Sequence, residues 1–504
     1  MRDLFSPTQV YHVLEEVGRG TFGTVFKCLR RGRNGQLVVA VKRLTLDRHS
    51  YRGIRNELKL LRAVCSDEDS STKCHIVRFF EEFSDLSHQY LVFEMLEKSL
   101  HQLQSESGFR PMAVRNIRVI TDQMLKALQK LKELGVVHAD VKPENIMLVH
   151  HSRFPFRVKL IDFGRADILS KVRSVRAPYI QSRYYRAPEV LLGLPFSEKV
   201  DMWSLGCVMS ELYLGWPLYP GDSEMQQVSY ICKTQGLPHE SLLHSASKTH
   251  LFFKRNMRTG AAQWQLKADG KQDRRKYLLS SLDQLSDMDA REREPGLLWK
   301  DTEAEESDRR CMVNLLKRIL TLGSRWRISP ERALGHAFLT LEHLVARSAQ
   351  FSSYHRSATL AMEQALLQLP KHVIPQPPPH PAHHHRPNKQ PCCSREPRTC
   401  HPPRPGPLSQ AENQPQGSRV QPPESPCQPG NESEDQRAET DDDQSPSRSE
   451  ESVRCGSEVG GARSHGRHSE FLGRTWDPDI TPVVLGCLTT APTSPATNGP
   501  TQRR

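Results

Sequence analysis

Residues 138–145 read His-Ala-Asp-Val-Lys-Pro-Glu-Asn, and Asp162-Phe163-Gly164 begins seventeen residues after the asparagine. Two carboxylates, a lysine and a carboxamide in this order suit a site that holds metal-bound phosphates beside a hydroxyl nucleophile. Asp140 suits the base or orienting carboxylate, Lys142 the positive charge, and Asn145 with Asp162 the metal ligands. An isolated His-x-Asp-x(4)-Asn pattern also occurs in ordinary polar loops, so the neighbouring segments decide its meaning.

A glycine-rich segment near the N-terminus predicts a loop that covers phosphates. It follows a strand predicted over residues 11–17, and its glycines would let the backbone approach phosphate oxygens closely. A dinucleotide-binding fold would need these glycines to open a helix, but residues 24–30 have the β-branched composition of a second strand. We therefore predict a hairpin lid over a nucleotide. Its residues are Val17, Gly18, Arg19, Gly20, Thr21, Phe22, Gly23 and Val25.

A lysine at the end of an apolar strand predicts a buried ion pair. Residues 38–42 read Val-Val-Ala-Val-Lys, and a buried ammonium group needs a partner of opposite charge. Glu57 lies fifteen residues later, in a segment whose apolar positions follow helical periodicity. A Lys42–Glu57 pair would orient the lysine toward the α- and β-phosphates. The alternative is a solvent-facing lysine with a surface glutamate.

The wall of the same pocket is predicted from an apolar strand that runs into a polar connector at residues 90–96. Phe93 would stand at the back of the pocket, and Ala40, Glu94 and Leu96 are assigned to its lining. An apolar stripe from Ile117 to Leu134, ended by Gly135, then predicts a long helix. This helix leads into residues 138–145, which we call the catalytic loop.

The segment between Gly164 and Ala187 carries six cationic side chains, and we expect an anion to meet them. Farther on, Glu189 and Arg327 are predicted to form a buried structural pair that does not touch substrate. Residues 240–300 show little periodicity and predict an inserted loop.

Composition divides the chain into two parts. Residues 351–504 contain 24 of the 36 prolines and are nearly neutral, so the basic excess belongs to residues 1–350. Ten carboxylates lie between residues 424 and 451, and the apolar content of this region is too low to offset chain entropy. The C-terminal part is therefore predicted to be a disordered tail.

Composition also limits the compartment and the partners. The twelve cysteines form no paired framework, the chain begins without an apolar leader, and no apolar run is long enough to cross a bilayer. We expect a cytoplasmic protein, with nuclear entry left open, and no membrane partner. Base-stacking and zinc patterns are absent from the sequence, so direct nucleic-acid binding is not expected.

The assembled motifs resemble the eukaryotic protein kinases over about residues 11–345. Several stretches are similar to the homeodomain-interacting protein kinases: His138-Ala-Asp, Ile180-Gln-Ser-Arg-Tyr-Tyr-Arg-Ala-Pro-Glu-Val190, Leu192-Gly-Leu-Pro-Phe and Leu214-Gly-Trp-Pro-Leu-Tyr-Pro-Gly221. Three more resemble one member of that family in particular: Lys59-Leu-Leu, Phe156-Arg-Val-Lys and Phe252-Phe-Lys-Arg-Asn256.

This resemblance implies an α+β, two-lobed protein kinase fold with a small β-rich N-lobe and a larger helical C-lobe. The corresponding division is an N-terminal extension at 1–10, a kinase domain at 11–345 and a disordered tail at 346–504. By matching motif, Lys42 and the glycine loop would bind ATP, Asp140 would be the catalytic acid or base, and Asn145 and Asp162 would hold Mg²⁺.

The resemblance also implies a reaction and partners. A monomeric kinase would phosphorylate Ser or Thr followed by proline in protein substrates, with transcription regulators as one candidate class, and would phosphorylate its own activation segment on tyrosine. A catalytically weak pseudokinase scaffold is the alternative. The intact set of Lys42, Asp140, Asn145 and Asp162 favours the enzyme.

The chain departs from the family pattern at two places, Arg165-Ala166-Asp167 and an insert near residues 257–300 that is short and altered. Arg165-Ala166-Asp167 replaces an expected Ser-Ala-Ser, which we expect to affect regulation and substrate choice and to leave phosphate handling alone. Ala139 stands where most kinases have an arginine that clamps a phosphorylated segment. We therefore predict that Tyr179 is phosphorylated and that Arg183 and Arg186 hold its phosphate.

Overall fold

The computed structural model describes residues 3–20, 23–32, 35–46, 50–65, 74–172, 180–256, 263–268, 270–288, 297–345 and 348–367. Thr21, Phe22 and Tyr179, and the predicted tail after residue 367, lie outside these ranges.

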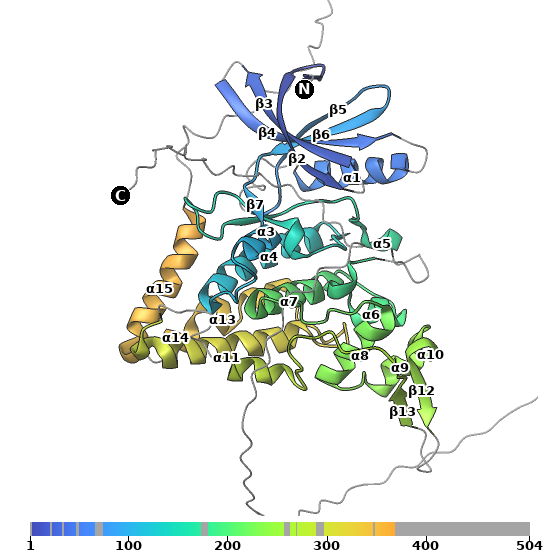
Figure 1. Cartoon of the computed structure of the whole chain (residues 1–504), viewed down its shortest axis with the longest axis vertical. Helices are drawn as coiled ribbons and strands as arrows, with labels where there is room; N and C mark the ends of the chain where they lie inside the picture. The colour runs from blue at the N-terminus through green and yellow to red at the C-terminus, as the bar shows by residue number, and fades with distance from the viewer. Residues whose placement is uncertain are drawn as a thin grey trace, which may run out of the picture. The chain divides into compact units, whose positions relative to one another are not determined.

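The N-lobe is a six-stranded antiparallel sheet with the order β1-β2-β3-β4-β6-β5, and helix α1 lies against it (Figure 1). Its elements are β1 (Leu4–Phe5), β2 (Val10–Gly20), β3 (Gly23–Gly32), β4 (Gly35–Thr45), α1 (Ser50–Val64), β5 (Phe79–Ser84) and β6 (His88–Glu94).

Alternation along β4 decides what each face of the sheet carries. Val39 and Val41 join an apolar cluster on one face, whereas Ala40 belongs to the main core on the other. Because successive strand side chains point to opposite faces, Lys42 follows Ala40 toward the main core. The strand therefore delivers a cation into an apolar environment.

The C-lobe is predominantly helical and contains short sheets, of which β12–β13 lies at the end away from the N-lobe (Figure 1). Its larger helices are α3 (Leu100–Glu106), α4 (Val114–Glu133), α7 (Lys199–Leu214), α8 (Glu224–Gln235), α11 (Thr302–Ile319) and α15 (Ser348–Leu366). The shorter helices are α5 (Leu169–Val172), α6 (Pro188–Leu192), α9 (Glu240–Ser245), α10 (Thr249–Phe252), α12 (Pro330–Leu334), α13 (Ala337–Thr340) and α14 (Glu342–Val345).

The C-lobe strands are β7 (Lys98–Ser99), β8 (Val136–Val137), β9 (Ile146–Leu148), β10 (Val158–Leu160), β11 (Asp167–Ile168), β12 (Phe253–Asn256) and β13 (Gln263–Leu266). Short 3₁₀-helices are η1 (Pro143–Asn145), η2 (Arg183–Tyr185), η3 (Leu282–Asp287) and η5 (Trp299–Asp301). The predicted two-lobed α+β fold is confirmed. The long predicted helix is also confirmed as α4, and Gly135 follows it in a left-handed conformation with φ of +65°.

The prediction of an inserted loop at residues 240–300 was wrong for much of that region. It contains α9, α10, the β12–β13 hairpin and η3. These elements are too short for periodicity to reveal, and local capping helps to define them. Ser281 and Gln284, for example, form a reciprocal capping box at the start of η3.

Helix α15 corrects the predicted start of the tail. Residues 348–366 were included in the disordered region, but Phe351, Tyr354, Ala358 and Ala365 are buried at helical spacing along one face of this helix. Their signal was hidden because composition was averaged over the whole C-terminal third. The ordered part of the chain therefore extends to at least residue 366.

A buried carboxylate ties α15 to the C-lobe. Asp308 on α11 accepts hydrogen bonds from Arg118 on α4, His343 on α14 and the Tyr354 hydroxyl on α15. The Tyr354 and His343 contacts are both 2.9 Å. Four helices thus share one anion, and each partner satisfies a polar group that would be costly to bury alone.

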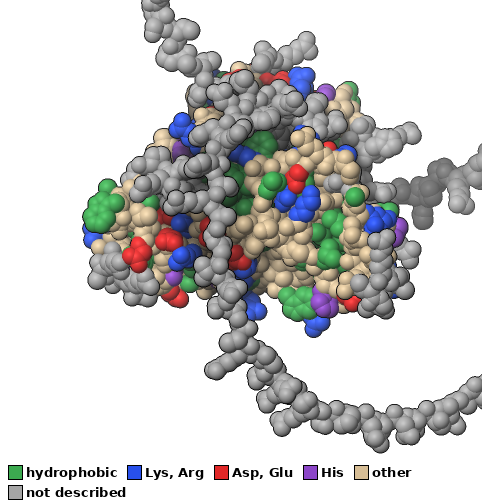
Figure 2. All heavy atoms as spheres, turned by 60° about the horizontal axis from the view of Figure 1, so that its bottom comes forward, with side chains coloured by type: hydrophobic (Ala, Val, Ile, Leu, Met, Phe, Trp, Pro, Cys, Tyr) green, Lys and Arg blue, Asp and Glu red, His purple; other side chains and the backbone are tan. Residues whose placement is uncertain are grey.

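The lower end of the C-lobe shows interspersed positive and negative side chains with separate apolar patches (Figure 2). Large exposed apolar residues include Trp299 and Trp326. Within the described ranges, none of the helices has the length and hydropathy that crossing a membrane requires.

The Asp308 network predicts a pH-dependent stability. Both ring nitrogens of His343 face acceptors, Asp308 Oδ1 at 2.9 Å and the Ala337 carbonyl at 3.0 Å, as an imidazolium requires. Burial lowers the pKa of His343, but interactions with Asp308 and Cys311 together outweigh burial and raise it to about 9. This contribution to the free energy of unfolding should be complete below pH ~6.5 and lost as the pH rises to about 9, a loss of about 3 kcal/mol.

Urea unfolding of wild type, His343→Gln and the exposed-histidine control His250→Gln between pH 6 and 9.5 tests this. The decline in the free energy of unfolding with rising pH should disappear in His343→Gln and persist in wild type and His250→Gln. Equal pH slopes in all three proteins would contradict it.

Candidate active site

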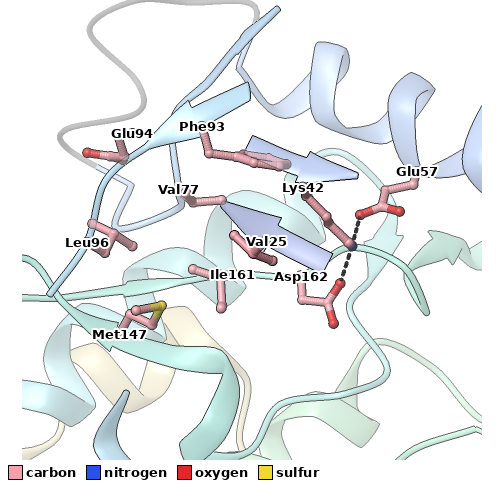
Figure 3. A pocket seen from close by; sticks show the side chains of 10 residues that line it. All are labelled: Val25, Lys42, Glu57, Val77, Phe93, Glu94, Leu96, Met147, Ile161 and Asp162. Carbon is pink, nitrogen blue, oxygen red and sulfur yellow. Dashed lines mark hydrogen bonds and ion pairs between the residues drawn. The ribbon is translucent and has the colours of Figure 1, made fainter. Parts of the chain in front are cut away.

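Three charged side chains from separate elements meet at the boundary of the lobes (Figure 3). Lys42 Nζ on β4 lies 2.8 Å from Glu57 Oε1 on α1 and 2.9 Å from Asp162 Oδ1, just after β10. The predicted Lys42–Glu57 contact is therefore present. The positive charge stands between a helix of the small lobe and the Asp162-Phe163-Gly164 segment of the large one.

Burial makes this cluster electrostatically strong. Burial alone would lower the pKa of Lys42, but Asp162 and Glu57 outweigh it and raise that pKa above its ordinary value. Burial would likewise raise the pKa of Asp162, yet Lys42 lowers it to about 2. The cluster therefore presents a fixed ammonium group and a fixed carboxylate at one end of the pocket.

An apolar pocket opens beside this cluster, and Figure 3 shows its lining. The predicted residues Val25, Lys42, Glu57, Phe93, Glu94 and Leu96 are brought together there, as is Asp162. The sequence reasoning missed Val77, Met147 and Ile161, which complete the lining. Each sits in a short strand or connector, where an apolar residue has no distinguishing pattern.

The glycine segment forms the end of the β2–β3 hairpin, as predicted. Gly18 pairs with Val25, and Gly20 pairs with Gly23. A Cβ on Gly23 would lie 2.0 Å from the Arg43 carbonyl oxygen, so only glycine fits there without movement. Arg19 pairs with Glu16 at the surface, while Val17 and Ala40 are buried in the adjoining core.

The catalytic loop gathers donors around Asp140. The Ser182 hydroxyl donates to its Oδ1 at 2.7 Å, and Lys142 Nζ lies 3.0 Å from its Oδ2. Asn145 Nδ2 donates to the Asp140 carbonyl at 2.9 Å and to its Oδ2 at 3.2 Å. The carboxylate is thus fixed in orientation by three side chains.

Asp201 holds the loop by its backbone, a role that the sequence did not reveal. Its two carboxylate oxygens accept the N–H groups of His138 at 2.7 Å and Ala139 at 2.9 Å. Burial raises the pKa of Asp201 to about 6. Ala139 and Asp162 both adopt left-handed backbone angles, φ of +60° and +63°, so the surroundings must enforce this conformation.

Gln181 is a second anchor that was missed. It is fully buried with φ of +65°, and its N–H donates to the Ala139 carbonyl at 3.0 Å. Its side-chain amide donates to Ser204 and accepts the N–H of Ala187. A single glutamine between Ile180 and Ser182 gives no sequence pattern that distinguishes it from an exposed loop residue.

Arg165 lies closer to the phosphate-handling residues than we expected. Its Nε is 3.9 Å from Asp140 Oδ2, although its side chain remains 40% exposed. The departure from Ser-Ala-Ser therefore reaches the carboxylate of the catalytic loop itself. We expected Arg165-Ala166-Asp167 to affect only regulation and substrate choice. The position of Arg165 shows that this segment also reaches a residue assigned to phosphoryl transfer.

The two arginines assigned to the Tyr179 phosphate occupy different environments. Arg183 is half-buried, whereas Arg186 is buried and donates to the carbonyls of Ile180 and Gln181 and to Glu224. Arg186 therefore stabilises the backbone of the segment through contacts that involve no phosphate.

The predicted structural pair is present. Arg327 donates to both oxygens of Glu189 at 2.6 and 2.8 Å, with side-chain exposures of 0% and 1%. Its guanidinium also lies 5.2 Å from the Trp203 ring centroid. This bidentate, stacked geometry joins the segment after η2 to α7.

Comparison with known proteins agrees with this geometry. A family model described as a protein kinase domain matches residues 11–339. The chain belongs to the protein kinase family. A protein kinase domain implies binding of ATP, usually together with Mg²⁺.

The kinase is 50% identical to human homeodomain-interacting protein kinase 4 over 381 residues, which is 73% of this chain and 61% of that protein. The mouse protein of the same name is 51% identical over 373 residues, covering 71% and 59%. Homeodomain-interacting protein kinase 2 of Mesocricetus auratus is 45% identical over 351 residues, covering 68% and 29%. The resemblance found in the sequence, including the member it favoured, is confirmed. The chain spans about three fifths of the length of the homeodomain-interacting protein kinase 4 sequences that it matches.

The oxygen donors present fit Mg²⁺. Asn145 uses its amide nitrogen to bond Asp140, and among the described residues nothing donates to its side-chain oxygen. Asp162 gives one oxygen to Lys42 and Gly164. Hard oxygen ligands from one carboxylate and one amide, completed by phosphates and water, are what Mg²⁺ commonly takes in nucleotide sites.

The Glu189–Arg327 pair should be strongly coupled. Glu189→Gln or Arg327→Met alone should lower the free energy of unfolding by about 3–5 kcal/mol, because each leaves a buried polar group without its partner. The double variant should cost clearly less than the sum. Urea unfolding measures all three, with Lys317→Met, which breaks the exposed Lys317–Asp283 pair, as a control expected to cost under ~1 kcal/mol. Strict additivity would refute the coupling.

Proposed function

We propose that this protein is a serine/threonine kinase that transfers the γ-phosphoryl group of ATP to protein hydroxyl groups. The observation that carries the proposal is the arrangement of Asp140, which is fixed by Ser182, Lys142 and Asn145 beside the Lys42–Asp162 cluster. This places an oriented carboxylate next to residues that bind phosphate charge.

Asp140 would accept the proton of the substrate hydroxyl as its oxygen forms a bond to the γ-phosphorus and the bond to the ADP oxygen breaks. Lys142 would bind a non-bridging oxygen of the transferred group, and Lys42 would bind the α- and β-phosphates. Asn145 and Asp162 would hold Mg²⁺, which supplies neutralisation of phosphate charge when bound.

The finer assignments rest on the family resemblance. Substrates would carry Ser or Thr before proline, and transcription regulators are one candidate class, as the names of the similar proteins suggest. We place the kinase in the cytoplasm as a monomer, with nuclear entry left open, and without nucleic acid or membrane as a direct partner.

A catalytically weak scaffold is the competing function. It would use the same fold to bind partners and would tolerate loss of the catalytic carboxylate. Lys42 contacts Glu57 and Asp162, and Asp140 is held separately by Lys142, Ser182 and Asn145, which supports the enzyme.

Turnover should depend on Asp140 without a matching effect on folding. Asp140→Asn should lower kcat on a Ser-Pro peptide at least ~100-fold, because it removes the proton acceptor. Radiolabelled ATP with Mg²⁺ measures incorporation, a Ser-Ala peptide tests proline preference, and thermal unfolding checks the fold. Asp283→Asn, at an exposed carboxylate, is the matched control. Equal incorporation by Asp140→Asn and wild type would exclude the enzyme.

The Tyr179 prediction calls for a coupled test. Tyr179→Phe keeps the ring and removes the phosphate acceptor, so activity should fall at least ~10-fold. Arg183→Ala should cause a similar loss in wild type and little further loss in Tyr179→Phe. Arg183 is the better probe because Arg186 has structural partners that its removal would also disturb. Activity of Tyr179→Phe within about twofold of wild type would reject the switch.

A further inference from the structure

A polar groove of about 590 Å³ lies between α15, the start of α4 and the connection from β9 to β10. Its lining shares no residue with the nucleotide pocket. One wall belongs to the region that the kinase family model matches, and the other, α15, begins after that match ends at residue 339. The groove is therefore built by an element outside the family-matched region.

Helix α15 presents different chemistry on its two faces. Phe351, Tyr354 and Ala358 are buried against the C-lobe. The groove is lined by Ser353, Arg356, Ser357 and Leu360, and also by neighbouring α15 residues Ser352, Ala361 and Gln364. Because these positions are three or four residues apart, they form one continuous helical face.

The charges in the groove have one sign. Arg115 from α4, Lys300 from η5 and Arg356 from α15 all line it, whereas none of its lining residues is Asp or Glu. Lys300 is close in sequence to Asp301 and Glu303, and Arg356 is close to Glu363. Neither cation forms an ion pair with any described residue. Cations contributed by three separate elements favour an anion that can accept from several directions.

Neutral donors and apolar surface complete the lining. Ser352, Ser353 and Ser357 supply hydroxyl groups, and Phe156 and Leu360 supply apolar contact. A phosphoryl group offers three oxygens to such donors, and the peptide that carries it offers side chains to the apolar surface. An isolated carboxylate offers fewer acceptors and less charge.

Both walls of the groove are held rigidly. Arg157, just before β10, donates to the Ala365 carbonyl at 2.6 Å and the Leu367 carbonyl at 2.5 Å, so it fixes the C-terminal end of α15. Phe156 is held at φ of +56°, with its carbonyl accepting from Gln123 at 2.8 Å. A pre-ordered groove loses little conformational freedom when a ligand binds.

We propose that this groove binds a phosphorylated serine- or threonine-containing peptide segment of a partner protein. Arg356, Lys300 and Arg115 bind the phosphoryl oxygens, the α15 serines add hydrogen bonds, and Phe156 with Leu360 contacts an apolar flanking residue. Such a site retains a partner that already carries a phosphate, away from the pocket that holds the nucleotide. It goes beyond phosphoryl transfer and does not depend on turnover.

The test uses the full-length Asp140→Asn protein, so that no phosphate is transferred during the measurement. The probe is a fluorescein-labelled pool of 12-residue peptides with a central phosphoserine and degenerate flanks. Matched pools carry serine or a Glu-Glu pair at the centre. Fluorescence anisotropy should show at least ~10-fold tighter binding of the phosphoserine pool than of either matched pool.

Variants then locate the site. Arg356→Gln and Lys300→Gln, both at exposed positions, should each weaken phosphoserine binding at least ~5-fold with unchanged thermal unfolding. Arg356→Lys should retain part of the affinity, because it keeps the charge and loses the planar donor fork. Arg310→Gln, which removes the same charge from an exposed position elsewhere on the C-lobe, should have no effect.

Several outcomes would overturn the proposal. Equal affinity for the phosphoserine and Glu-Glu pools would make the groove a general acidic-peptide surface. Loss of binding in Arg183→Gln but not in Arg356→Gln would move the phosphate to the activation segment. Arg356-dependent binding to vesicles containing phosphatidylserine, without phosphopeptide binding, would make the groove a membrane contact.

Discussion

The two hydrogen bonds that Asp201 accepts from backbone N–H groups are the constraint on which the active site depends. His138 and Ala139 have no helical or strand partner for these N–H groups, and Ala139 is held in a left-handed conformation that costs free energy. The buried Asp201 carboxylate offsets the cost of the unpaired N–H groups and of the left-handed conformation, because it accepts both hydrogen bonds at once. It lies on α7, a helix whose residues are almost all buried. The Asp140 carboxylate is then presented from a loop whose first two residues are each held by a backbone hydrogen bond to Asp201. Gln181 attaches the activation segment to the same loop through the Ala139 carbonyl, so the substrate-facing segment is positioned by the same anchor.

Charge is used differently in the two lobes. In the N-lobe, Lys42 is buried between two carboxylates and serves the nucleotide pocket, so its surroundings are pre-arranged for phosphate. In the C-lobe, Arg327 and Arg186 are equally buried but bind backbone carbonyls and acidic side chains of the protein itself. The distinction is one of geometry: a planar guanidinium can bridge several fixed acceptors, whereas a single ammonium leaves room for a visiting anion.

The sequence predicted those parts of the molecule in which spacing dictates chemistry. The Lys42–Glu57 contact, the hairpin of the glycine loop, α4 and the Glu189–Arg327 pair could be predicted because each joins a periodic or charged pattern to a physical need. Asp201 and Gln181 could not, because their importance lies in backbone groups that they meet only after folding. The pocket residues Val77, Met147 and Ile161 could not be predicted for a similar reason. An apolar residue in a short strand or connector can equally well pack in the core or line a pocket. Helix α15 escaped because averaging over a long polar region concealed four buried positions.

Helix α15 also bears on where the folding unit ends. The kinase family match stops at residue 339, but Phe351 and Tyr354 are packed with Leu341, Leu344 and Ala304 in a cluster of their own. A fragment cut at the end of the match would lose most of that cluster, leave Ala304 uncovered, and remove two donors, His343 and Tyr354, from the buried Asp308 carboxylate. Exposed apolar surface of this kind promotes association between molecules, so the shortened domain would tend to aggregate while its active site remained complete. The boundary that governs solubility therefore lies two helices, α14 and α15, beyond the end of the family match.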